Sequence, residues 1–372
     1  MSTNLTIPDY LKETDNDVHK RMIDNAPENI STVEGDLFWD NTRPVAKEMA
    51  RVKNISMLSL LRSRFAQTAI GDDLDLVGEE DGILRKQEDF AIQLIKFTGI
   101  SGTPISKGSI ITTVGTEDQV SIEFETQEEI KIDTTGVTTV KATCLIAGII
   151  GNVAIGNISV LAKSINGVQA VSNIEIVQKG VEKESDDDYR YRILLKARTP
   201  ATSGNVYHYM NWALEVTGVG AVKVKPLWDK NNGLNGNGSV KVVIADSERH
   251  SVTSGLITNT FNHIEEVRPI GATVTVVSAA EKAINITANI KLADGFTIQQ
   301  VQATFIELLT EYLKSIAFNA TYVSINRLGN LFFDTIGVLD YSDFKINGAV
   351  GNIVLTDEEI AVSGTTELGV VA

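Results

Sequence analysis

The sequence predicts an α+β protein of several domains: amino-terminal helices, then a β-rich barrel or sandwich domain, then small α/β domains with mixed sheets. Three observations support this fold class. The chain has 372 residues, enough for more than one domain of about 100 to 200 residues. Apolar residues recur three and four apart from Thr42 to Ala69, as in helices, and alternate from Phe90 to Gln178, as in strands. Beyond residue 181, segments with the helical spacing and segments with the strand-like alternation follow one another along the chain.

Residues 1–41 are predicted to form a polar, irregular arm that orders against another element, because no regular apolar pattern runs through them. A helical segment at 42–85 follows. Its apolar spacing slips across Asn54, Ile55 and Ser56, which predicts a kinked helix or two helices in series.

Six apolar residues form the stripe of this helical segment: Val45, Met49, Val52, Leu58, Leu61 and Phe65. An apolar stripe can lie on the core of its own chain or join a bundle with a partner. Amphipathic helices usually face their own domain, and the spacing alone leaves both alternatives open.

A β-rich domain is predicted at 86–180. Val120, Ile122 and Phe124 alternate with polar residues, as does the segment from Val140 to Ile146, and Gly, Asn, Thr and Ser turns separate such segments. Cys144 falls in phase with Val140, so we interpret it as a buried small hydrophobe rather than a reactive thiol. As the single cysteine, it cannot form an internal disulfide.

A central α/β domain is predicted at 181–280. It opens with a well-marked helix, because Ser185 and Asp188 have the spacing of a capping box. Asp186 and Asp187 lie in the first turn, where the helix dipole favours negative charge. A second helix follows, and then the order strand, strand, helix, strand indicates a small α/β domain.

A carboxyl-terminal α/β domain is predicted at 281–372. Its first strand alternates through Ile284, Ile286 and Ala288, and a long amphipathic helix comes next. A second helix is expected from Val323 to Ile336, followed by a β-rich ending from Gly337.

Charge and composition exclude several classes of function. The net charge of −15 at pH 7 disfavours a partner that presents phosphates, either nucleic acid or a membrane surface. No apolar run approaches the roughly 20 residues that span a bilayer. The first 25 residues carry charges throughout, so we expect no secretion signal and synthesis in the cytoplasm.

A search for chemistry predicts no catalytic residue, no cofactor-binding residue and no metal ligand. The glycine-rich loop Gly233–Gly238 lies between two expected strands and lacks the Lys-Ser/Thr of a phosphate loop, so a hairpin connection is the better interpretation. The histidines have no spacing suited to a metal ion, and we interpret His208 as a packing or surface residue.

The central segment carries a recognisable series of motifs. An acidic helix cap precedes Tyr189-Arg-x-Arg-Ile-Leu194, the turn Ser203-Gly-Asn205, then Tyr209-x-x-Trp-Ala213 and a strand. This order closely resembles the central signature of the baseplate J-like proteins of contractile phage tails and phage-tail-like particles. Further motifs follow the order of the same family: Thr68-Ala-x-Gly-x-x-Leu-Asp75, Gly82-Ile-x-Arg85, Pro104-Ile-x-x-Gly-Ser109, Gly148-x-x-Gly-Asn152 and Gly337-Val-x-Asp340.

The resemblance implies a structural wedge component of a contractile injection machine, a phage tail or an R-type bacteriocin. Such a component forms a ring around the central hub and relays the trigger for sheath contraction. The implied partners are copies of itself, a smaller tail protein of the wedge, and the hub, spike and sheath-initiating baseplate proteins. On this interpretation the chain is assembled into a baseplate, and the stripe from Val45 to Phe65 joins a bundle with partner helices.

Two other functions remain open. Carboxylates on a β-domain are compatible with a tail-associated cell-wall hydrolase, although 48 acidic residues make some suitable pair an expected coincidence. A β-rich receptor-binding adhesin is the other alternative. The expectation from the whole sequence is a protein that is not an enzyme and needs no cofactor.

Overall fold

The computed structural model describes residues 9–115, 120–199, 204–228, 236 and 238–371. The chain divides into two compact units, one of residues 1–85 with 185–198 and one of residues 86–184 with 199–372. Most of the predicted loop Gly233–Gly238 and the start of the turn at Ser203 lie outside the described residues.

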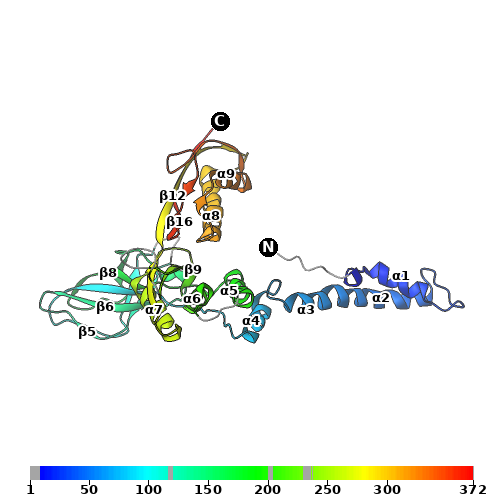
Figure 1. Cartoon of the computed structure of the whole chain (residues 1–372), viewed down its shortest axis with the longest axis horizontal. Coiled ribbons are helices and arrows are strands. Elements are labelled where there is room, and N and C mark those ends of the chain that lie inside the picture. Colours follow the sequence, from blue (N-terminus) through cyan, green and yellow to red (C-terminus); the bar gives the residue numbers. More distant parts are fainter. Residues whose placement is uncertain (1–8, 116–119, 200–203, 229–235, 237, 372) are drawn as a thin grey trace. The chain divides into compact units, whose positions relative to one another are not determined.

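In its described residues the first unit consists of helices and their connections, and α1 lies alongside α2 (Figure 1). The elements of this unit are η1 (Asp9–Leu11), α1 (Asp15–Asp24), α2 (Leu37–Arg51), the π-helix η2 (Val52–Met57), α3 (Leu58–Ser63), α4 (Gly71–Glu80) and α5 (Asp186–Arg198).

The expectation of an irregular arm before residue 42 is wrong for much of that segment. Helix α1 begins after Thr14, which forms a capping box with Asp17. The arm packs against its own chain, because Val18 is fully buried with residues of α2. Helix α2 also begins earlier than expected, at Leu37. The few apolar residues of α1 give too weak a periodicity to be recognised in the sequence.

The predicted slip in the helical segment is confirmed. The π-helix η2 spans Val52–Met57, so it contains Asn54, Ile55 and Ser56 and connects α2 to α3. A π-turn places more residues in each turn than an α-helix does, which moves an apolar stripe around the helix axis. This is the physical cause of the irregular spacing.

The β-rich domain of the second unit is a nearly closed six-stranded barrel, with strand order β7-β3-β4-β6-β1-β8 and antiparallel pairs throughout. Its elements are β1 (Ile92–Gly99), β2 (Pro104–Ile105), β3 (Ile110–Thr113), β4 (Glu123–Thr126), β5 (Ile130–Lys131), β6 (Val137–Cys144), η3 (Ile149–Gly151), β7 (Ile158–Leu161) and β8 (Val168–Gln178).

The predicted alternation holds in β6, where Val140, Ala142 and Cys144 all enter the barrel core. Burial accordingly raises the pKa of the Cys144 thiol. The alternation expected from Val120 is wrong at its start, because β4 begins at Glu123 and Val120 is 91% exposed.

The barrel seam between β7 and β8 is closed by side-chain amides. Asn173 on β8 is fully buried, and its Oδ1 accepts hydrogen bonds from the backbone N–H groups of Gly156 and Ile158 at 2.8 and 3.0 Å. Its Nδ2 donates to Gln93 Oε1 at 2.7 Å. The bond from Ile158 satisfies a buried backbone N–H group, and the bond to Gln93 satisfies a buried side-chain amide oxygen.

The central domain has a three-stranded sheet in the order β11-β10-β9, with β9 antiparallel and β11 parallel to β10. Its elements are α6 (Val206–Glu215), β9 (Val219–Pro226), β10 (Ser239–Asp246), α7 (Ser254–Val267) and β11 (Thr273–Ser278). The predicted order of strands and helix is confirmed.

The carboxyl-terminal domain packs α8 and α9 on a three-stranded sheet in the order β14-β12-β16. Phe305 of α8 and Phe332 of α9 stack with ring centroids 4.2 Å apart in this core. The elements are β12 (Ala280–Leu292), α8 (Ile298–Ile316), β13 (Tyr322–Val323), α9 (Ile325–Asp334), β14 (Val338–Ile346), β15 (Ile353–Val354) and β16 (Glu359–Val370).

Candidate assembly interface on the amino-terminal helices

Helix α2 uses one face to pack against α1. Ala46 and Ala50 are buried there with Val18, and Met22 packs against them. Arg43 strengthens this pair, because its Nη2 lies 2.8 Å from both the Asp15 carboxylate and the Asn16 amide oxygen. The side of α2 that holds Ala46 and Ala50 is therefore already occupied by the chain itself.

Glu13 joins the start of α1 to the π-helix. Its Oε2 accepts a hydrogen bond from Lys53 Nζ at 2.6 Å, its backbone oxygen accepts one from Asn54 Nδ2 at 2.8 Å, and Arg21 forms an ion pair with the same carboxylate. The hydrogen bond from Lys53, followed by that from Arg21, lowers the pKa of the Glu13 carboxyl group. We call Glu13, Arg21, Lys53 and Asn54 the Glu13 clasp.

A different face of α2 and η2 is apolar and open. Val45, Met49 and Val52 are 50%, 44% and 47% exposed. With neighbouring residues they line a shallow groove, formed by Pro44, Val45, Glu48, Met49, Val52, Lys53 and Met57. We call these seven residues the α2 groove. Adjacent exposed apolar side chains of this size are typical of surfaces that contact another molecule.

The six residues of the predicted stripe do not share one environment. Val45, Met49 and Val52 line the α2 groove, and Phe65 is also exposed. Leu58 and Leu61 on α3 are half-buried. The stripe is thus open along α2 and partly covered along α3.

Three further apolar residues near the stripe are exposed and were missed in the sequence: Ile55, Met57 and Leu60. They come at or just after the π-helix, where the extra residue per turn changes which positions share a face. The slip of the apolar spacing at Asn54 indicated in the sequence that the stripe changes there. It did not indicate on which side of the helix the stripe continues.

The family-like motifs before and after the barrel segment come together in the first unit. The Asp186 carboxylate accepts a hydrogen bond from the Gly71 N–H at 2.9 Å and lies 2.8 Å from Arg85 Nη2. The bond from Gly71, with Arg85 adding to it, lowers the pKa of Asp186. Arg85 also binds Asp75 at 2.6 Å and lies over the Tyr189 ring.

Tyr189 is the centre of this motif cluster. It is buried, its hydroxyl donates to the Ile83 backbone oxygen at 2.6 Å, and it packs with Leu74 and Ile193. The cap predicted at Ser185 is confirmed, because the Ser185 hydroxyl accepts a hydrogen bond from the Asp188 N–H at 3.2 Å. These motifs hold α4 and α5 together, and their charged groups Asp75, Arg85 and Asp186 bind one another within this contact.

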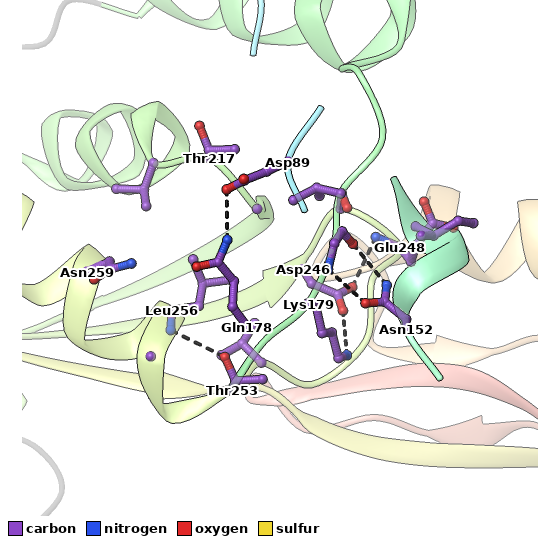
Figure 2. A pocket seen from close by; sticks show the side chains of 18 of the residues that line it. Asp89, Asn152, Gln178, Lys179, Thr217, Asp246, Glu248, Thr253, Leu256 and Asn259 are labelled. Carbon is purple, nitrogen blue, oxygen red and sulfur yellow. Dashed lines mark hydrogen bonds and ion pairs between the residues drawn. The ribbon is translucent and has the colours of Figure 1, made fainter. Parts of the chain in front are cut away.

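A cavity of about 350 Å³ in the second unit is the place where an enzymatic site could be sought. Figure 2 shows that its polar side chains contact one another: Gln178 donates to Asp89 at 2.9 Å, and Lys179 donates to Asp246 at 2.8 Å.

Among the described residues, no group of three His, Cys, Asp or Glu side chains could hold a metal ion. The same part of the chain contains no helix with the length and apolar character needed to cross a membrane.

Comparison with known proteins identifies the family. Three family models match: the baseplate J-like barrel domain over residues 94–180, the central domain over 201–278 and the carboxyl-terminal domain over 284–369. A phage-like element PBSX protein, XkdT, of Bacillus subtilis is 30% identical over 94% of this chain and 96% of its own length. The chain belongs to the baseplate J-like family.

Two further relatives of this baseplate J-like chain match over different lengths. The uncharacterized protein YqbT of Bacillus subtilis is 31% identical over 96% of this chain and 97% of its own length. Baseplate protein gp47 of Escherichia phage Mu is 27% identical over 56% of this chain and 61% of its own length. The resemblance inferred from the motifs is thereby confirmed, and the chain is a structural baseplate component of a generally non-enzymatic family.

Proposed function

We propose that this baseplate J-like protein is a wedge component of a contractile injection machine and joins other subunits through the α2 groove. The observation that carries the proposal is the open apolar face at Val45, Met49 and Val52, which its own α1 leaves uncovered. Membership of the family supports a role in the baseplate.

The energy available from the α2 groove is modest. Complete burial of a Val or Met side chain contributes about 1.5 to 3 kcal/mol, and these three are already about half covered. Together they can therefore contribute about 3 kcal/mol. Association costs more than that, so a stable joint needs a longer surface, and Ile55, Met57 and Leu60 provide its continuation.

In the proposed assembly, copies of this chain and a smaller tail protein of the wedge contribute helices to one bundle. The wedges form a ring around the hub and spike, contact the sheath-initiating baseplate proteins, and relay the trigger for sheath contraction. The chain is made in the bacterial cytoplasm and assembled there into a phage tail or an R-type bacteriocin. Ring symmetry favours this arrangement, because a repeated subunit can bury the same surface in every copy.

Replacing Met49 and Val52 with Asp tests the joint. Both side chains are partly exposed, so the variant M49D/V52D should fold, whereas a buried carboxylate in the bundle lacks a partner and prevents association. The expected result is loss of co-purification with the other wedge proteins, measured by pull-down from cells that produce the whole particle. Circular dichroism of the isolated chain should be unchanged.

Lys47→Asp is the matched control, because Lys47 is an exposed residue of α2 that does not line the groove. Its co-purification should equal that of the wild type. If M49D/V52D still binds its partners as the wild type does, the groove is not the joint. Electron microscopy of the particle that locates this chain outside the baseplate rejects the wedge role itself.

A further inference from the structure

The central and carboxyl-terminal domains share a packed core. Only Ala279 separates β11 from β12, and its N–H donates to the Ile244 backbone oxygen of β10 at 2.8 Å. Five buried residues from both domains form one apolar cluster: Val243, Ala245, Ala279, Ala317 and Ile360. A close-packed interior of this kind resists deformation.

Charged groups reinforce the same joint. Glu358, just before β16, lies 2.8 Å from Lys241 and 3.0 Å from Lys225, which come from the central sheet. Glu248 after β10 lies 2.6 Å from Lys314 near the end of α8. The central and carboxyl-terminal domains are therefore held together by a core and by ion pairs, as one body.

The joint between the barrel and the central domain is built differently. The cavity of about 350 Å³ lies here and is lined by residues of both domains. The barrel core consists of barrel residues alone. Lys179, which follows β8, donates to Asp246 Oδ2 at 2.8 Å (Figure 2). It also donates to the Ser251 backbone oxygen at 3.0 Å, and thus joins the end of the barrel to the end of β10 and the loop after it.

Two chain segments next to the cavity form a neck, which we define as residues 86–89 and 179–184. Asp89 and Val181 exchange two backbone hydrogen bonds, which pair the segments. Asn152 of the barrel region binds both the N–H and the C=O of Gly180. The neck is thus attached to the barrel by directed polar bonds. It is attached to the central domain by Lys179 and by Lys86, whose Nζ donates to the Val219 backbone oxygen at 2.8 Å.

We propose that the barrel and the body made by the central and carboxyl-terminal domains rotate against each other at the neck, with Lys179 as the latch that holds the described arrangement. The cavity leaves space for side chains to move during rotation. The hydrogen bonds that Lys179 makes between the domains can exchange for bonds to water during rotation. The apolar residues Val177, Val216 and Leu256 of this joint line the cavity. Rotation at such a joint, with rigid domains on both sides, is a common form of conformational change.

Spin-label distance measurements on the full chain test this proposal. One label pair, Glu128→Cys in the barrel and Glu307→Cys on α8, spans the neck. A second pair, Thr258→Cys on α7 and Glu307→Cys, stays within the body. These three sites are exposed, and the native Cys144 is buried in the barrel core and should not be labelled.

Lys179→Met removes the charge of the latch but keeps much of the side chain. It should widen the distance distribution of the pair at 128 and 307 and leave that of the pair at 258 and 307 unchanged. Lys225→Met is the matched control, because it removes one ion pair from the packed joint. Both distributions should stay narrow in that variant.

An unchanged distribution at 128 and 307 in Lys179→Met overturns the latch. A widened distribution at 258 and 307, in either variant, overturns the single rigid body. These measurements use the isolated chain, and the proposed assembly role is tested by co-purification, so each proposal can fail without the other.

Discussion

At the scale of single residues, the family-like motifs are explained by packing. Gly78 on α4 faces Tyr189 of α5 so closely that a Cβ atom would lie 2.0 Å from the tyrosine hydroxyl oxygen. That hydroxyl is itself held by the Ile83 backbone oxygen. The glycine is therefore required by the approach of two helices, although glycine inside a helix is otherwise unfavourable.

We predict that Gly78→Ala destabilises the first unit by about 1 to 3 kcal/mol, because the new methyl group overpacks a closed site. In the double variant, Tyr189→Phe should recover part of the lost stability, because it removes the hydroxyl oxygen that lies nearest to the new methyl group. Urea unfolding of the single and double variants measures both effects. Gly351→Ala is the control, since a Cβ there meets no atom within 4 Å. Equal midpoints for the two alanine variants would contradict this account.

The barrel seam depends on a single residue, Asn173, whose side chain bonds buried polar groups of the barrel. Replacement by Ala leaves the buried N–H group of Ile158 and the buried Oε1 of Gln93 without their Asn173 partners. Each unsatisfied buried group costs about 1 to 3 kcal/mol, so Asn173→Ala should lower the free energy of unfolding by about 2 to 4 kcal/mol. The neighbouring Ser172→Ala should change it by less than about 0.5 kcal/mol. Denaturant titration followed by circular dichroism distinguishes them, and similar losses for both variants would reject the seam function of Asn173.

At the scale of elements, α2 packs one face against its own chain and exposes another face to solvent. The small residues Ala46 and Ala50 let α1 pack closely, while the larger Val45 and Met49 remain available to a partner. The π-helix after Arg51 then changes the direction of the apolar face. The Glu13 clasp fixes the start of α1 to this π-helix.

The clasp predicts a pH dependence of the α1–α2 pair. The pKa of Glu13 in the folded chain lies below its usual value of 4.5. A carboxyl group of this kind contributes its stabilisation at pH values above the unfolded pKa, and loses it as the pH falls through the folded pKa. Asp17, whose pKa is lowered by hydrogen bonds from Thr14, acts with the same sign. Helix α1 should therefore loosen below about pH 4.5.

Methyl NMR of Val18 and Met22, which pack between the two helices, measures this change. Glu13→Gln should weaken the pairing at pH 7 and reduce its dependence on pH. Asp9→Asn is the control, because it removes the same charge from an exposed pair with Lys12. Identical titration curves for Glu13→Gln and the wild type would show that the clasp does not hold α1.

At the scale of the whole molecule, the second unit contains two joints that are built differently. One shares an apolar core and ion pairs, and the other contains a cavity and is joined by the hydrogen bonds of Lys179. The proposed relay of a trigger needs both kinds: rigid parts that transmit a displacement and a place where the displacement occurs. In the two proposals, Lys179 controls movement within the chain and the α2 groove holds the chain to other subunits. Different residues therefore serve movement and assembly.

The sequence by itself determined the fold class, the family and the order of elements in the central domain. Periodicity marks β6 and α8, the cap at Ser185 marks α5, and the ordered motifs mark the family, because each of these signals arises from neighbours along the chain. Only the tertiary structure decided that α1 packs on α2, that Asn173 closes the barrel, and that Lys179 meets Asp246. Such contacts join residues far apart in the chain, and their pairing depends on how folded elements meet in space rather than on local pattern.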